Sequence, residues 1–320
     1  MPLTDHVALV SLTRDVPTRL LLQAAAAIQK QITRDFAPYW GPRVTVDAFE
    51  DLESVPSDYH PIVIFSATNE LVSTLEYAIG EERTADIVDD FERGEMTGLH
   101  MNSFTRQPFA LVAASDTWSV TLSHEALEMI TDPFGNRLVA ASHPLDPRRR
   151  VRYLLEICDP CQAIWYPVNG VPVSDFYCPR YFDPVLPDRD RYSFTGAIER
   201  PLEILEGGYL SWVDPGDSAL YQLGAGEPVE TLVADLDDLK RSTAALRTIV
   251  DTSPVTPRVT RRTLRPANTA FAATGAVAAV AEASRGTGLR VAQAIRSLAA
   301  EDGRAVEPRL PRTQGSDDRD

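Results

Sequence analysis

The segment Trp118–Thr131 constrains the fold most, because its apolar residues recur with the period of an α-helix. A short apolar run, Phe109–Ala113, precedes it as an expected strand, and the Asp-Pro pair at 132–133 ends it. Each helical residue advances about 100° around the axis, so the apolar side chains fill an arc from roughly 140° to 320°, measured from His124. The pattern therefore predicts an amphipathic helix that follows a buried strand.

The other side of this helix gathers a histidine and three carboxylates in one narrow stripe. With His124 at zero, Glu128 falls at about 40°, Asp132 at about 80° and Glu125 at about 100°. A His and a carboxylate four residues apart can share one metal ion, and a Glu beside the His can take a proton from metal-bound water. Asp132 precedes a proline and is expected to end the helix rather than to bind metal.

This arrangement is the HExxH pattern of zincins with Glu128 in place of the second histidine. A His–Glu pair is a harder ligand set than two histidines and selects zinc less strictly. We therefore expect Zn²⁺ held by His124 and Glu128, with another divalent metal as the alternative, and Glu125 as the general base.

A third ligand is expected from the acidic residues that follow the strand-like run Val151–Leu155. A catalytic zinc site uses three protein ligands and keeps one position open. Strand alternation would place Glu156 and Asp159 on opposite faces, so that only one faces the helix unless the strand has already ended. Because Pro160 favours the end of the strand at Asp159, we favour Asp159 as the ligand and keep Glu156 as the alternative.

Several other interpretations compete with the metal site. The helix could be an ordinary amphipathic one whose acidic face is solvated, because HExxE alone is a weak motif. Cys158 and Cys161 form a CxxC that could be half a zinc knuckle or a redox pair, but the sequence has no second CxxC. His100 and His143 are expected at the surface. The sequence contains no GxSxG, P-loop or GxGxxG motif, so we expect no nucleotide cofactor.

The remaining elements predict an α+β fold, a mixed sheet packed on helices. Residues 137–213 are expected to form short strands and turns rich in proline and aromatic residues. The other expected elements are strands at Val7–Leu12, Val44–Val46 and Ile62–Phe65, and helices at Pro17–Asp35, Leu71–Glu92 and Leu232–Val250.

Charge divides the chain into two expected parts. The formal net charge is −15, which argues against nucleic-acid binding. Residues 251–320 hold 11 basic and 8 acidic residues, or +3, which leaves −18 for residues 1–250. We expect a metal-binding domain at 1–250 and, at 251–320, a linker and a partly disordered tail that contains alanine and arginine. No apolar run approaches the roughly 18 residues of a membrane span and the N-terminus is no secretion signal, so a cytoplasmic protein without membrane contact is expected.

The stretch WSVTLSHEALEMITDPFGN, followed by LLEICDPCQ, resembles a group of poorly characterised bacterial zincin-like proteins with an HExxE…ExxD pattern. The segments QITRDFAPYWG, VNGVPVSDFYCPRYFDP and GGYLSWVD extend the resemblance over roughly residues 7–213. It implies a zincin-like fold with an active-site helix at Trp118–Asp132. It also implies His124 and Glu128 as ligands, Glu125 as the base, and Asp159 or Glu156 at the downstream acidic position.

These observations lead to two expected functions. The first is a zinc-dependent, peptidase-like hydrolase in which metal-activated water attacks a peptide bond in a peptide or protein substrate, with Glu125 as general base. The alternative is a catalytically inactive zincin-fold binding or scaffold protein with a structural metal or none. In the second case the C-terminal tail is the candidate partner-binding segment.

Overall fold

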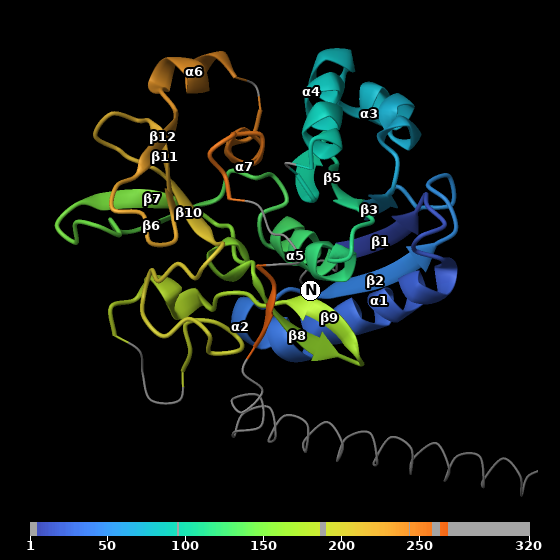
Figure 1. Ribbon diagram of the computed structural model, residues 1–320, viewed down its shortest axis with the longest axis horizontal. Coiled ribbons are helices and arrows are strands. Elements are labelled where there is room, and N and C mark those ends of the chain that lie inside the picture. The colour runs from blue at the N-terminus through green and yellow to red at the C-terminus, as the bar shows by residue number, and fades with distance from the viewer. Residues whose placement is uncertain (1–4, 95, 186–189, 243, 258–262, 268–320) are drawn as a thin grey trace, which may run out of the picture. The chain divides into compact units, whose positions relative to one another are not determined.

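The N-terminal part of the chain forms a five-stranded mixed sheet in the order β2-β1-β3-β5-β4 (Figure 1). This computed structural model describes residues 5–94, 96–185, 190–242, 244–257 and 263–267. Neighbouring strands are parallel except β4, which runs antiparallel to β5 at one edge. The strands are β1 (Asp5–Ser11), β2 (Val44–Phe49), β3 (Tyr59–Phe65), β4 (Gly98–Asn102) and β5 (Pro108–Ala113).

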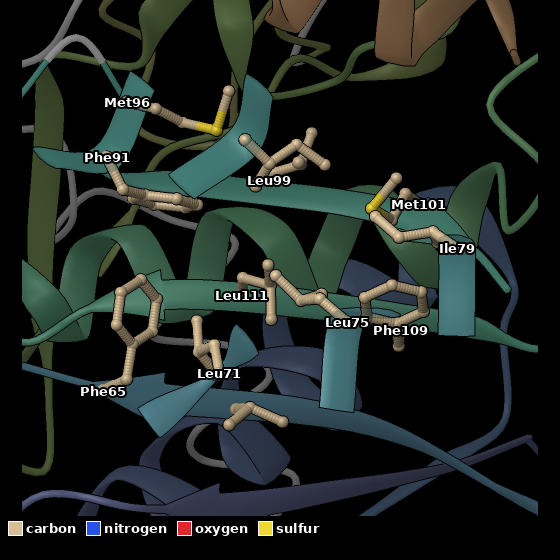
Figure 2. Close-up of a cluster of buried hydrophobic side chains, with 12 residues drawn as sticks. Phe65, Leu71, Leu75, Ile79, Phe91, Met96, Leu99, Met101, Phe109 and Leu111 are labelled. Carbon is tan, nitrogen blue, oxygen red and sulfur yellow. The ribbon is translucent and has the colours of Figure 1, made fainter. Parts of the chain in front are cut away.

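Helices cover both faces of this sheet. On one face, α3 (Val72–Ile79) and α4 (Glu81–Glu92) enclose an apolar cluster with β3, β4 and β5. On the other face lie α5 (Trp118–Thr131) and α1 (Thr18–Lys30). Helix α1 continues through a π-helical turn, Gln31–Phe36, into the short α2 (Ala37–Trp40). Figure 2 shows α3 side chains meeting those of β4 and β5, among them Leu71, Leu75, Ile79, Leu99, Met101, Phe109 and Leu111.

The alternation of β4 connects this core to α5. Leu99 and Met101 point into the cluster beneath α3 and α4. Successive side chains of a strand point to opposite faces, so Gly98, His100 and Asn102 face the side occupied by α5. The antiparallel edge strand thus carries apolar residues on one face and presents its polar residues to the stripe of α5.

A second, antiparallel sheet has the order β12-β11-β10-β7-β6, and α7 (Leu246–Asp251) packs against it. The helix expected at Leu232–Val250 is wrong in its first part. Residues 231–234 form strand β12 because they pair with β11, and a capping box at Asp235 then begins α6. The strands and the short helix are β6 (Leu138–Ser142), β7 (Arg150–Leu154), β10 (Tyr209–Val213), β11 (Leu220–Gly224), β12 (Thr231–Ala234) and α6 (Leu236–Arg241).

A small third sheet, β13-β8-β9, lies beside α5 and α1. It consists of β8 (Ile164–Val168), β9 (Val171–Ser174) and β13 (Arg265–Pro266), and β13 runs parallel to β8. The α+β class and the short strands and turns expected over residues 137–213 are confirmed. Among the described residues, no helix has the length and apolar character needed to cross a bilayer.

Described residues on both sides of the expected boundary at Asp251 belong to one compact unit of the chain. The hydroxyl of Thr256 donates to the carbonyl of Val250 at 2.6 Å and accepts from Gln222 at 3.0 Å. The chain continues to pack beyond α7 because these buried polar groups hold it to the second sheet and the β13 pairing holds it to the third. The expected tail from residue 268 onward lies outside the described residues.

Candidate metal centre

The polar stripe of α5 is buried. His124, Glu125 and Glu128 are each less than a tenth exposed, which contradicts the solvated face considered from the sequence. Ser123 fixes the helix against β9, because its hydroxyl oxygen accepts a hydrogen bond from the amide of Ser174 at 2.6 Å. The stripe is covered by segments remote in sequence: β4, the turn after β7, and α7. Ordinary amphipathicity does not account for an acidic face enclosed in this way.

Three of the sequence-predicted residues meet at one point. His124 Nε2 lies 3.2 Å from Glu128 Oε2 and 3.2 Å from Asp159 Oδ1. The other carboxylate oxygen of Glu128, Oε1, accepts a hydrogen bond from the amide of Cys158 at 3.0 Å, which fixes the side chain. Asp159 begins the 3-10 turn Asp159–Cys161, and this turn carries its carboxylate toward α5. One nitrogen and two carboxylate oxygens thus converge, as the sequence predicted for the favoured ligand set.

Glu156 also faces this cluster. Both acids therefore lie near α5, whereas strand alternation predicts that only one of them does. Strand β7 ends at Leu154, before either residue, and alternation no longer applies beyond that point. Carboxylate oxygens of Glu128, Glu156 and Asp159 lie within 4.8 Å of one another. Glu156 pairs with Arg247 rather than with His124, which leaves Asp159 as the acid beside the histidine.

Arg247 on α7 is the residue that sequence reasoning missed. Its buried guanidinium lies 2.8 Å from Glu128, 3.0 Å from Asp159 and 2.8 Å from Asp251, and it also pairs with Glu156. The available sequence signal was an arginine four residues before an aspartate in the otherwise apolar segment Leu246–Asp251.

The backbone brings α7 close to the end of α5. The amide of Arg247 donates to the carbonyl of Gly135 at 3.0 Å. Gly135 has a left-handed φ of 61°, and a Cβ there would lie 2.8 Å from the Cβ of Arg247. A glycine is therefore required both for the turn and for the approach of the arginine.

Charge in the cluster is unevenly balanced. Burial raises the pKa of Asp159, and the neighbouring charge of Glu128 raises it further. Burial opposes ionisation of Glu128 as well, but the charges of Arg247 and His124 hold its pKa well below its usual range. Burial alone would lower the pKa of His124, yet Glu128 and Asp159 raise it well above its ordinary value. Burial raises the pKa of Asp251 to about 6. The carboxylates therefore compete for positive charge, which His124, Arg247 and bound protons supply.

Glu125 lies on the open side of the cluster. Its Oε2 is 3.1 Å from Nδ1 of His100, a buried residue of β4 rather than the surface residue expected. A Cβ at Gly98 would lie 2.5 Å from Glu125 Oε1 and 2.4 Å from Thr121, so only glycine leaves room for this carboxylate. Glu125 and His124 line a cavity of about 50 Å³, which is large enough for a water molecule.

The remaining sequence candidates have structural roles. Asp132 caps the end of α5, and its Oδ2 accepts from the amide of Arg137 at 2.6 Å, as expected for a helix end. Cys158 and Cys161 are free and buried, and burial raises the pKa of both thiols well above the ordinary value. They are therefore thiols at neutral pH, which does not favour a redox pair. His143, expected at the surface, is buried against Trp212.

The residues present fit a divalent cation. Glu128 Oε2 and Asp159 Oδ1 are buried and each lies 3.2 Å from His124 Nε2, while Glu128 Oε2 also lies 2.8 Å from Arg247 Nη2. A cation would satisfy both oxygens, and a set of one imidazole and two carboxylates suits zinc. The site can therefore hold a metal and place Glu125 and His100 beside it. No protein-family model, curated protein or solved structure matches this chain.

Proposed function

We propose that this chain is a zincin-like, zinc-dependent hydrolase of the peptidase type, with His124, Glu128 and Asp159 as metal ligands. The observation that carries the proposal is the convergence of two buried carboxylate oxygens, one of Glu128 and one of Asp159, on one histidine nitrogen. The mixed sheet with an antiparallel edge strand in front of α5 supports the zincin-like assignment by its arrangement alone.

When bound, zinc would lower the pKa of a water ligand and polarise a substrate carbonyl. Glu125 would accept a proton from that water, because its carboxylate lines the cavity beside His124. His100 orients Glu125 through the 3.1 Å contact of Nδ1 with Oε2, and Gly98 leaves the space that this position requires. The amide of Cys158 holds Glu128 in its orientation toward His124.

Metal content tests the first half of the proposal. Elemental analysis of the purified full-length chain should give about one zinc per chain, removable by a chelator. His124→Ala should abolish retention, because it removes the imidazole at the centre of the cluster, and Glu128→Gln should weaken it. His60→Ala is the matched control, since His60 lies on β3 and is only half-buried. Stoichiometric zinc in His124→Ala would show that the site is elsewhere.

Catalysis tests the second half. Glu125→Gln should keep the metal and lose hydrolysis of a peptide or casein-type substrate, because an amide has the same shape but cannot accept the proton. The expected loss is at least about a hundredfold in rate. Wild-type turnover in this variant would remove Glu125 as the base, whereas loss of zinc would mean that it is a ligand.

Arg247 favours the second candidate function, a binding or scaffold protein without catalysis. Its guanidinium pairs with both proposed carboxylate ligands, Glu128 and Asp159, and supplies part of the positive charge that a metal would supply. A purified chain that contains no metal, gains none on incubation with zinc, and remains folded in chelator would support this candidate over the hydrolase.

A further inference from the structure

A second cavity, of about 430 Å³, lies at the Asn102 end of β4, whereas Glu125 of α5 lies beside Gly98 at the other end of the strand. Gly98, His100 and Asn102 share one face of this strand. Gly98 lines the cavity beside Glu125, and Asn102 lines the second cavity. Four residues of strand span roughly 13 Å, so the two cavities are separated by about the length of four residues of an extended peptide.

Two arginines line this second cavity, in a chain whose net charge is −15. Arg83 lies in the first turn of α4, and Arg106 lies in the turn between β4 and β5. Neither guanidinium forms an ion pair or a hydrogen bond with another residue in the part of the chain that the structure describes. Burial lowers the pKa of Arg83, as expected for a cation that is partly dehydrated without a nearby anion.

The turn that carries Arg106 is anchored to α3, and its backbone is strained at Arg106. The amide of Phe104 donates to the carbonyl of Ala78 at 2.8 Å, which fastens this turn to the end of α3. Arg106 has a left-handed φ of 63°, a conformation that glycine or asparagine would adopt more easily. An arginine at a strained backbone position, lining the same cavity as a second arginine, points to a binding role for the pair.

The other lining groups define the kind of ligand. Asn102 Oδ1 is buried and accepts no hydrogen bond from a described residue, so it can accept one from a ligand N–H. Phe104 and Phe134 are 68% and 53% exposed and give the cavity apolar walls. A volume of about 430 Å³ is far larger than the roughly 30 Å³ of a water-sized ion. Arginines, an amide acceptor and aromatic walls suit a peptide segment better than a free anion.

We propose that this cavity binds an acidic side chain of a peptide, with Arg83 and Arg106 pairing with its carboxylate and the two phenylalanines contacting an adjacent apolar residue. The role of that peptide as substrate rests on the proposed function. In that case the acidic residue lies about four residues from the bond that is cleaved, because β4 separates the two cavities by that length.

Binding of a matched pair of probes tests the proposal on the full-length chain. The first probe is a fluorescein-labelled, N-acetylated polyalanine octapeptide that contains one Phe-Glu pair, and the second has Phe-Gln instead. Fluorescence anisotropy should show about tenfold tighter binding of the Glu probe, because two charge-assisted contacts distinguish it from Gln. Arg83→Met and Arg106→Met should each abolish most of this preference.

Two further variants make the test specific. Arg148→Met removes an arginine whose side chain is 90% exposed and which pairs with Asp146 elsewhere, so it should leave the preference unchanged. Arg83→Lys keeps the charge of a half-buried residue and should keep part of the preference, which separates loss of charge from loss of folding.

Equal affinity for the Glu and Gln probes, or an unchanged preference in both methionine variants, would overturn the proposal. Binding of inorganic phosphate that depends on both arginines, without a Glu preference, would also overturn it in favour of a phosphate site. A Glu preference in a chain that binds no zinc would uphold this site and refute the proposed function. Zinc-dependent hydrolysis without a Glu preference would do the reverse.

Discussion

Two clusters in this protein are built from the same groups but lie in different surroundings. In the candidate metal centre, Arg247 meets Glu128, Asp159 and Asp251, and its side chain is only 3% exposed. At the rim of the second sheet, Arg149 pairs with Asp214 and Glu230, and its side chain is 46% exposed. Each cluster also contains a histidine, His124 in the first and His143 in the second.

The extent of burial, rather than the kinds of residues present, decides what such a cluster can do. Water screens the charges around Arg149, so each pair there contributes little and can be lost cheaply. Around Arg247 the carboxylates are dehydrated, so each needs a cation, a proton or a hydrogen bond. In the buried cluster, carboxylate oxygens of Glu128 and Asp159 converge on His124, an arrangement that favours capture of a metal.

Removing the guanidinium of Arg247 should have the largest effect on the stability of the protein. Arg247→Met leaves buried carboxylates without their guanidinium, and we expect the free energy of unfolding to fall by about 3–5 kcal/mol in the presence of chelator. Urea denaturation monitored by circular dichroism measures this loss. Saturating zinc should restore part of the stability, because the ion supplies positive charge at the same carboxylates. A loss below about 1 kcal/mol would mean that the cluster is screened like the one at the surface.

Removing the charge of the buried carboxylate of Asp175 should have the next largest effect on stability. Asp175 accepts from the amide of Thr195 at 3.0 Å and from its hydroxyl at 2.6 Å, and burial raises its pKa to about 6. Because its folded-state pKa lies above the ordinary value of 3.8, its contribution to stability is present at low pH and is lost as the pH rises toward 6.

Asp175→Asn should remove that loss, since an asparagine has no charge; its Oδ1 can still accept from the amide of Thr195, and its NH2 group can donate to the hydroxyl of Thr195. Relative to the wild type, the variant should gain about 2–3 kcal/mol in unfolding free energy between about pH 4 and pH 7.5. Urea denaturation at both pH values checks the sign. A parallel pH dependence in variant and wild type would show that Asp175 ionises normally.

Adding a methyl group beside Glu125 should have an intermediate effect on stability. A methyl group at Gly98 would lie 2.5 Å from Glu125 Oε1, so Gly98→Ala should cost about 1–3 kcal/mol and lower hydrolysis while zinc is retained. Gly216→Ala is the matched control in the surface cluster, where a Cβ would lie 3.2 Å from Asp214 Oδ1 on an exposed turn. Equal effects of the two substitutions on stability would contradict the contrast between the clusters.

The smallest effect is expected at the surface arginine. Arg149→Met should lower the free energy of unfolding by less than about 1 kcal/mol, and less still at high salt, because the Arg149 side chain is 46% exposed where it pairs with Asp214 and Glu230. Urea denaturation at low and high ionic strength measures it. A loss comparable to that of Arg247→Met would refute the distinction.

Local patterns in the sequence were sufficient for the elements that build the site. The helical period of Trp118–Thr131 predicted α5 with its bounds. The apolar run Phe109–Ala113 predicted the preceding strand, β5, except for its first residue. The i, i+4 spacing predicted that His124 and Glu128 point the same way. These predictions hold because helical and strand periodicity depend on neighbouring residues, whose relative positions the backbone fixes.

What surrounds the stripe could not be obtained from such patterns. The sequence determined a helix with one histidine and its carboxylates in register, and it favoured Asp159, with Glu156 as the alternative, as the acid to join them. Only the tertiary structure decided that the stripe is buried, that His100 from β4 orients Glu125, and that Arg247 lies among the carboxylates. The physical reason is that these contacts join residues 25 to more than 100 positions apart, and each depends on how strands pair and sheets pack rather than on any local period.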